Sequence, residues 1–377
     1  MTLIPVDGPF REAVIDLSAV RDNVASLRAR IGTPFFLIVV KANAYGHGMV
    51  PVAQAALAGG ATHLGVADVA EALALRAAGI TAPVLAWLHD PREDFIAAVT
   101  ADITVCVSSV EQLESVARAG HAAAVRPVVH VKVDTGLSRN GVSADNWASF
   151  FARAAELEAH GSITVEGIFS HLSNASAEDD LAQGVRFDAA IDLARAAGLA
   201  PAITHLSASV AALTLPQLNY NMVRIGIATY GISPIDTQAP QEFGLRPVMT
   251  LRARVAAVRE VPEGTGVSYN LTYRTSATSR LALVPMGYGE GLTRAASDRG
   301  PVVINGQRFA VSGRMAMDQF VVDCDQADVA VGDEVVLFGD PANGHPTVQD
   351  WAEATNTIGY EVVTQLGGRV VRTFIGA

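Results

Sequence analysis

Residues 35–48 read FFLIVVKANAYGHG, and the change of character halfway along this stretch guides the interpretation of the rest of the chain. Six apolar residues, typical of a β-strand, run directly into Lys41. A polar segment with two glycines follows. A lysine with a purely structural role is expected on a wet surface, so a lysine at the end of a buried strand indicates a chemical role.

Similar apolar runs continue along the first two thirds of the chain, separated by alanine-rich helical patterns. Two of these patterns end in glycine, a common helix stop. Eight strands that alternate with helices predict a (β/α)₈ barrel. A doubly wound open sheet is the alternative, but no G-x-G-x-x-G follows the first strand. The expected strands are residues 35–40, 62–66, 83–87, 103–107, 127–133, 163–169, 202–206 and 221–225.

The pattern changes after about residue 245. Short strand-like runs separated by Gly and Pro follow one another without helices, which indicates an all-β domain. We therefore predict a barrel domain over residues 1–244 and a strand-rich domain over residues 245–377. The strand-like run at residues 11–17 is a candidate to join the sheet of the second domain.

The composition limits the possible functions. Half of the 377 residues are apolar and 17% are charged, so a large core is easily filled. A net charge of −11 argues against a nucleic-acid partner, which requires a basic face. Cys106 and Cys324 lie in apolar runs and are expected to be buried free thiols. The N-terminus lacks the features of a signal peptide, and the uncharged residues 42–67 are interrupted by Gly, Pro and His, so a cytoplasmic protein without a membrane span is expected.

Polar and charged side chains gather at the carboxyl ends of the expected strands, where such a barrel places its site. A desolvated lysine can form a Schiff base, and the hydroxyl and glycine residues after the last two strands suit a phosphate. A carbonyl cofactor that carries a phosphate and binds lysine is pyridoxal phosphate. Lys132 alone would be taken for a surface lysine and each histidine for a core residue, but their shared placement favours a site. No metal ligand set is expected. The gathered residues are Lys41, Lys132, Arg139, His171, His205, Ser207, Ser209 and Arg224.

The segment VVKANAYGHG at residues 39–48 resembles the signature of alanine racemases, which are pyridoxal phosphate enzymes of fold type III. Further segments match that family in order along the whole chain. The resemblance implies interconversion of L-alanine and D-alanine, which supplies D-alanine for peptidoglycan. It also implies a homodimer whose active sites are shared between chains. The matching segments are VDTGLSRNG (133–141), GTGVSYNLTYRT (264–275), GRMAMDQ (313–319) and GYEVVTQLGGRVVR (359–372).

The resemblance also assigns roles to individual residues. Lys41 binds the cofactor and is one base, and Tyr269 is the base on the opposite face. Arg224 faces the pyridine nitrogen, and His171 is also among the residues at the cofactor. Together they favour the phenolate of Tyr269 by positive charge. The remaining residues complete the site: Arg139 at the substrate carboxylate, Met317 and Asp318 lent to the partner's site, Lys132 as a candidate for carbamylation, and Tyr45, Ser209, Gly226, Ile227 and Tyr360 at the phosphate.

Three positions depart from the family pattern, and none removes a catalytic group. They are Asn270 where Gly is usual, Ala208 where Asn is common, and Thr364 where Cys is frequent.

Two alternative functions stay open. The first alternative is a racemase that accepts a broader range of amino acids, because the lysine motif indicates the cofactor and not the substrate. The size of the substrate pocket should decide, and Tyr360 and Met317 are expected to line it. The other is a non-catalytic protein that binds pyridoxal phosphate, although such proteins generally lack the β domain and the second base.

Overall fold

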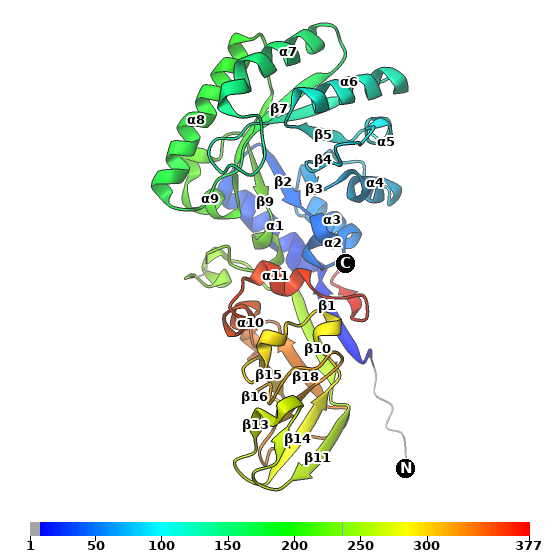
Figure 1. Cartoon of the computed structure of the whole chain (residues 1–377), viewed down its shortest axis with the longest axis vertical. Helices are drawn as coiled ribbons and strands as arrows, with labels where there is room; N and C mark the ends of the chain where they lie inside the picture. The colour runs from blue at the N-terminus through cyan, green and yellow to red at the C-terminus, as the bar shows by residue number, and fades with distance from the viewer. Residues whose placement is uncertain (1–7, 236) are drawn as a thin grey trace. The chain divides into compact units, whose positions relative to one another are not determined.

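The computed structural model describes residues 8–235 and 237–377 and divides the chain into two compact units (Figure 1). The barrel unit comprises Arg21–Ala44 and Met49–Thr229. The sheet unit comprises the described residues up to Val20, Tyr45–Gly48 and Tyr230–Ala377. The sequence-based division lay between residues 244 and 245, whereas these units divide at residues 229 and 230.

The barrel unit contains a closed barrel of eight strands, which confirms the predicted fold class. Neighbouring strands are parallel, and the first pairs with the last to close the barrel. Parallel strands covered on both faces are apolar along their whole length, which is why the eight runs were recognisable in the sequence. The strands are β2 (Phe35–Val39), β3 (His63–Val66), β4 (Val84–Ala86), β5 (Thr104–Val107), β6 (Val128–Lys132), β7 (Thr164–Phe169), β8 (Ile203–Ala208) and β9 (Met222–Ile225).

Helices alternate with these strands, and several begin at a side-chain cap. The side chains of Asp68, Ser109 and Ser176 each accept a hydrogen bond from the backbone three residues further on. A cap of this kind contributes about 1 kcal/mol to a helix. The helices are α1 (Leu17–Ile31), α3 (Met49–Ala58), α4 (Val69–Ala77), α5 (Ile96–Thr100), α6 (Val110–Ala123), α7 (Trp147–Ala159), α8 (Ala177–Ala196) and α9 (Ser209–Thr214).

The sheet unit is built around a six-stranded sheet in the order β16-β15-β18-β10-β1-β19. Strand β1 pairs antiparallel with β10 and parallel with β19, so the two ends of the described chain meet in one sheet. Two smaller sheets pair β11-β14-β17 and β12-β13. The strands are β1 (Arg11–Asp16), β10 (Met249–Arg254), β11 (Ala257–Val261), β12 (Gly266–Val267), β13 (Tyr273–Arg274), β14 (Ser279–Val284), β15 (Pro301–Ile304), β16 (Gln307–Ala310), β17 (Phe320–Asp323), β18 (Glu334–Phe338) and β19 (Val371–Ile375).

The sheet unit is strand-rich but not all-β. Two helices, α10 (Val348–Thr355) and α11 (Gly359–Thr364), interrupt the strands near the C-terminus. Helix α10 begins at a capping box, in which the Thr347 hydroxyl accepts from the Asp350 N–H. It buries Trp351, whose indole N–H donates to the Leu337 carbonyl. The sequence reading as a succession of strands without helices was therefore wrong in this segment.

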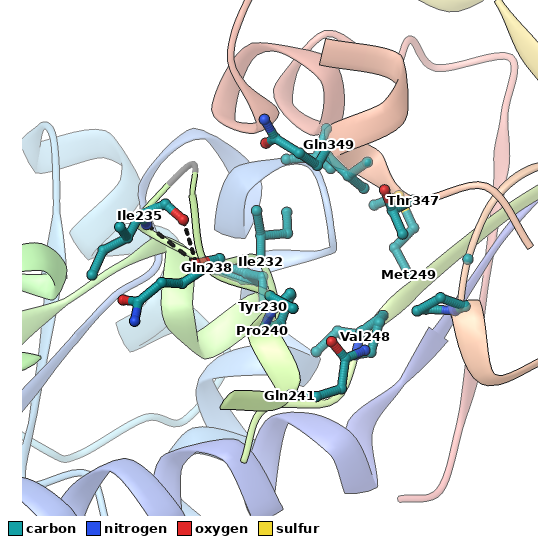
Figure 2. A pocket seen from close by; sticks show the side chains of 18 of the residues that line it. Tyr230, Ile232, Ile235, Gln238, Pro240, Gln241, Val248, Met249, Thr347 and Gln349 are labelled. Atoms are coloured by element: carbon teal, nitrogen blue, oxygen red, sulfur yellow. Dashed lines mark hydrogen bonds between the residues drawn. The ribbon is translucent and has the colours of Figure 1, made fainter. Parts of the chain in front are cut away.

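An apolar cavity of about 340 Å³ lies within the sheet unit (Figure 2). Tyr230, Ile232, Val248 and Met249 are among its lining residues. None of the predicted site residues in the described part of the chain lines it. This cavity is therefore not the site that the sequence predicted.

The remaining features agree with the expectations from composition. Cys106 and Cys324 are buried free thiols, as predicted. Among the helices that the structure describes, none is long and apolar enough to cross a membrane. Short 3₁₀ helices complete the description: η1 (Ala144–Asn146), η2 (Pro216–Leu218), η3 (Ile227–Tyr230), η4 (Pro240–Phe243), η5 (Tyr269–Leu271), η6 (Tyr288–Glu290), η7 (Arg294–Ala296) and η8 (Pro341–Asn343).

Candidate active site

The backbone directly after strand β2 takes a left-handed turn in the element α2 (Lys41–Tyr45). Four consecutive non-glycine residues, from Ala42 to Tyr45, have φ between 51° and 54°. Each left-handed residue costs about 1–2 kcal/mol, so the surroundings must hold the turn. The Ala42 N–H donates to Glu71 Oε1 at 2.6 Å, and the Ala44 N–H donates to the Val40 carbonyl at 2.8 Å. Strain held in this way is typical of a functional site.

Lys41 is half-buried at the start of this turn. Burial lowers the pKa of its amine, the positive charge of Arg139 lowers it further, and Glu71 partly opposes the change. Its Nζ atom lies 5.9 Å from the centroid of the Trp87 ring. A lowered pKa increases the fraction of uncharged amine near neutral pH, and the uncharged amine is the nucleophile and base.

Lys132 lies at the end of strand β6 and is almost fully buried. Burial again lowers the pKa of the amine. Arg224 and Arg139 also lower this pKa, whereas Cys106 raises it. Its Nζ lies 5.8 Å from the centroid of the Phe169 ring. The structure thus brings two desolvated amines and two arginines into one electrostatic cluster, which suits an anionic ligand.

Arg224 is buried at the end of strand β9 and is held on several sides. Its Nη2 atom lies 2.9 Å from the carbonyl oxygens of Ser170 and Leu206 and 3.0 Å from His171 Nδ1, so two N–H bonds are shared among three acceptors. Because arginine can only donate, His171 Nδ1 is an acceptor in this contact. Four of the predicted residues, Lys41, Lys132, Arg139 and Arg224, influence His171 electrostatically.

His171 is neutral in this environment. Burial, followed by the charge of Arg224, lowers the pKa of His171 to about 2. Because Nδ1 accepts from Arg224, the single ring proton lies on Nε2, which can donate a hydrogen bond. The expectation that His171 contributes a positive charge is therefore wrong, and its available contribution is an N–H donor.

Three of the predicted phosphate-binding residues come together after strands β8 and β9. The Gly226 N–H donates to Ser209 Oγ at 3.1 Å, and both residues are buried. Ile227, also buried, follows Gly226 in the chain and begins η3. A hydroxyl beside consecutive backbone N–H groups is a donor set that suits phosphate.

The other two, Tyr45 and Tyr360, belong to the sheet unit. Their ring centroids are 6.0 Å apart, and the Tyr230 ring lies 4.8 Å from that of Tyr45. Burial, with a smaller effect of Tyr360, raises the pKa of Tyr45. The Tyr45 hydroxyl therefore stays protonated and available as a hydrogen-bond donor.

The predicted second base and its companions also belong to the sheet unit. Tyr269 is 67% exposed and Met317 is 54% exposed, and Asp318 forms an ion pair with Arg369 at 2.7 Å. Asn270 has φ of 60°, a left-handed conformation that asparagine adopts more readily than most residues. This geometry explains why asparagine can stand where the family usually has glycine.

Glu71 and Trp87 contact the reactive segment but were not predicted. Glu71 accepts hydrogen bonds from the N–H groups of Ala42 and Ala67. In the sequence it stands three residues after the cap residue Asp68, where an acidic residue is ordinary in a helix. Its second role depends on Ala42, 29 residues away, which no local pattern indicates.

These features are typical of a barrel enzyme that uses a lysine amine as its reactive group. Here the candidate is Lys41, which follows the first barrel strand and shares an electrostatic cluster with Lys132, Arg139 and Arg224. Such a site suits a ligand that has both a carbonyl group and a phosphate.

The chain belongs to the alanine racemase family. Residues 15–234 match the alanine racemase N-terminal domain and residues 248–374 match the C-terminal domain. The chain is similar to the alanine racemase of Thermobifida fusca, with 47% identity over 98% of this chain and 99% of that one. It is 49% identical to that of Mycolicibacterium smegmatis over 97% and 95% of the two chains. The structure resembles that of alanine racemase from Streptomyces lavendulae, a producer of D-cycloserine, with a TM-score of 0.97, 44% identity and 98% of both chains covered.

Proposed function

We propose that this protein interconverts L-alanine and D-alanine and so supplies D-alanine for peptidoglycan. The observation that carries the proposal is the match of the whole chain to alanine racemases, with a desolvated Lys41 at the end of the first barrel strand. Both catalytic segments of the family are present, since Tyr269 stands in the segment that matches the second base. A cytoplasmic location stays a prediction.

Pyridoxal phosphate is the proposed cofactor, and the residues present fit it. Ser209 Oγ and the N–H groups of Gly226 and Ile227 would hold the phosphate, and the resemblance adds Tyr45 and Tyr360 to that set. The hydrogen bond from the Gly226 N–H to Ser209 Oγ places these two buried groups side by side, which supports this assignment. The amine of Lys41 would bind the carbonyl carbon of the cofactor. When bound, the cofactor supplies an electron sink that makes the α-proton of an amino acid acidic.

Two bases would move the α-proton of alanine. The uncharged amine of Lys41 would accept or return the proton on one face, because burial lowers its pKa. The hydroxyl of Tyr269, contributed by the partner subunit, would do the same on the other face. One base on each face allows inversion without turning the substrate. The exposed cation of Arg139 would bind the carboxylate of alanine.

To act as a base near neutral pH, Tyr269 requires neighbouring groups that stabilise its phenolate, because an ordinary tyrosine has a pKa of about 10. The Nε2–H of His171 would donate to the phenolate, and Arg224 would stabilise that charge through His171. Arg224 would also donate a hydrogen bond to the pyridine nitrogen without protonating it, because a guanidinium group retains its proton. An unprotonated nitrogen weakens the electron sink, so Arg224 would limit side reactions such as transamination.

The proposed working unit is a homodimer in which each active site takes Lys41 from one chain and Tyr269 with Met317 from the other. The high exposure of Tyr269 and Met317 supports this arrangement, since both side chains are free to serve a partner.

Lys132 is a proposed carbamylation site. Its amine is almost fully buried with a lowered pKa, and carbamylation requires the uncharged amine.

The experiment that tests this function measures racemisation of alanine, serine, lysine and ornithine by the purified protein loaded with pyridoxal phosphate. Alanine should react with a higher kcat/KM than the other three. Comparable rates for serine or lysine would favour a racemase with a broader range of substrates. Tight binding of the cofactor without racemisation of any of the four would favour a non-catalytic protein.

A further inference from the structure

An unbroken chain of hydrogen bonds runs from Arg224 through the barrel interior to a carboxylate. Arg224 Nη1 lies 3.1 Å from His205 Nδ1, and His205 Nε2 lies 2.9 Å from His130 Nδ1. His130 Nε2 lies 3.2 Å from Glu166 Oε2. The two histidines are at most 1% exposed, and neither they nor Glu166 has a part in the mechanism above.

The direction of every hydrogen bond in this chain follows from the chemistry of arginine. Arg224 can only donate, so His205 Nδ1 must accept. Burial and the charge of Arg224 hold the pKa of His205 well below 6.5, so this ring is neutral and carries its one proton on Nε2. That proton must be donated to His130 Nδ1, which leaves the proton of His130 on Nε2, facing Glu166. The His130–Glu166 contact is therefore a hydrogen bond from a neutral imidazole.

The barrel is built to accommodate this chain. A Cβ atom at Gly167 would lie 2.6 Å from the ring of His130, so the glycine leaves the space that the imidazole fills. Phe169 stacks on His205 with ring centroids 4.6 Å apart and an interplanar angle of 9°. The guanidinium carbon of Arg224 lies 5.4 Å from the centroid of the same Phe169 ring. Strand β7 thus supplies the terminal carboxylate, the space for one histidine and the stacking partner of the other.

Glu166 gives the chain a charged end. Its side chain is 36% exposed, and the hydrogen bond from His130 lowers the pKa of the carboxyl group. His63 lies nearby, but burial lowers its pKa to about 4, so it adds no charge near neutral pH. Successive hydrogen bonds that end on an ion polarise one another. A negative Glu166 therefore makes His205 Nδ1 a better acceptor for the proton of Arg224.

We propose that Glu166, His130 and His205 form a relay that orients Arg224 and sets how strongly Arg224 donates to the cofactor. The three are positioning residues, since they act through Arg224. The proposal rests on the proposed function, because it assumes that Arg224 faces the pyridine nitrogen. When the charge of Glu166 is removed, Arg224 should bind His205 less tightly and donate more strongly to that nitrogen.

The first test reads the histidine tautomers directly. ¹⁵N NMR of histidine-labelled, cofactor-free protein at pH 7.5, an ordinary neutral condition, should show His130 and His205 as neutral rings with the proton on Nε2. The variants His130→Asn and His205→Asn assign the two signals by their loss. A proton on Nδ1, or an imidazolium signal, for either ring would overturn the relay. This result does not depend on enzymatic activity.

The second test compares Glu166→Gln with Glu178→Gln, an exposed carboxylate outside the relay. The glutamine oxygen can still accept from His130, so Glu166→Gln removes the charge and keeps the hydrogen bond. The absorbance maximum of the bound cofactor should shift, and kcat should fall about 3- to 10-fold, the difference between a charged and a neutral hydrogen bond. Glu178→Gln should match the unmodified protein in both.

A third variant interrupts the series of hydrogen bonds from Arg224 to Glu166 by a different route. Gly167→Ala should displace the His130 ring and produce a shift of the cofactor absorbance in the same direction as Glu166→Gln. An unchanged spectrum in both variants, with the normal rate, would overturn the relay. Absence of racemisation by the unmodified protein would instead contradict the proposed function, and the tautomer test would still decide whether the chain has the inferred direction.

Discussion

At the scale of single residues, lysine is confined to the site. Lys41 and Lys132 are the only lysines of the sequence, and every other basic residue apart from histidine is arginine. Arginine remains charged under all ordinary conditions, whereas a buried lysine can lose its proton. Reagents specific for side-chain amines therefore report on the candidate active site alone.

Lys41 should carry the cofactor. Borohydride reduction of the loaded protein should attach a pyridoxyl group to Lys41, detected by mass spectrometry of the digested chain. Lys41→Ala should lower racemisation by at least about 10²-fold, the typical effect of losing a general base. In Lys132→Gln protein the pyridoxyl group should remain on Lys41. A pyridoxyl group found on Lys132 of the unmodified protein would show that the assignment is wrong.

The two bases should differ in stereochemistry. By the family resemblance, the lysine side meets the α-proton of D-alanine and the tyrosine side that of L-alanine. Tyr269→Phe keeps the ring but lacks the hydroxyl, so α-deuterium exchange in heavy water should fall about 10²–10⁴-fold from L-alanine and much less from D-alanine.

The matched control for this measurement is Tyr273→Phe, in the same segment, whose hydroxyl donates to Asp323 instead. It should affect exchange from the two enantiomers equally. Equal residual exchange from L-alanine and D-alanine in Tyr269→Phe would leave Lys41 as a single base and remove the catalytic role of Tyr269.

At the scale of elements, the turn that follows the candidate reactive lysine, Lys41, is also a strained part of the backbone. The left-handed turn of α2 ends at Gly46, whose φ is 80°. A Cβ atom there would lie 2.2 Å from the Val363 carbonyl oxygen, and the Gly46 carbonyl accepts from Arg372 Nε. The glycine is therefore required both by its conformation and by the close approach of α11.

Gly46→Ala should destabilise the protein by about 2–5 kcal/mol, from the left-handed backbone and the clash together. The matched control is Gly344→Ala, in the same unit, which has φ of 77° but no atom within 4 Å of the added Cβ. It should cost only about 1–2 kcal/mol, the conformational part alone. Urea unfolding of both variants measures the difference. Equal losses would show that the contact with Val363 relaxes without cost.

At the scale of the whole molecule, the proposed dimer makes a quantitative prediction. Lys41→Ala and Tyr269→Phe proteins should each be nearly inactive. Mixed in equal amounts and allowed to exchange subunits at random, they should recover about a quarter of the active sites, because half of the dimers are mixed and one site in each is intact.

The control uses a double variant that carries both changes on one chain, mixed with Lys41→Ala protein. No mixed dimer of this pair contains an intact Lys41, so no activity should return. If the first mixture stays inactive although mixed dimers are demonstrated by mass spectrometry, both bases come from one chain and the shared site is refuted.

The amino-acid sequence was sufficient to predict the barrel, and it pointed to Lys41 as the candidate reactive lysine. Apolar periodicity is a local property of the chain, so all eight barrel strands were recognised, each with ends close to those observed. The segment around Lys41 is equally local, because its glycines and lysine are neighbours in the chain. Helices α10 and α11 were missed, since their short apolar patterns lie among strand-like runs that resemble them.

The charge states and the hydrogen-bonding partners could be read only from the folded structure. The neutral state of His171 depends on Arg224, 53 residues away, and the His130–His205 hydrogen bond spans 75 residues. Glu71 supports the left-handed turn from another helix, and Gly167 leaves room for a histidine on a neighbouring strand. Desolvation and proximity determine each of these properties, and both arise only when distant segments pack together.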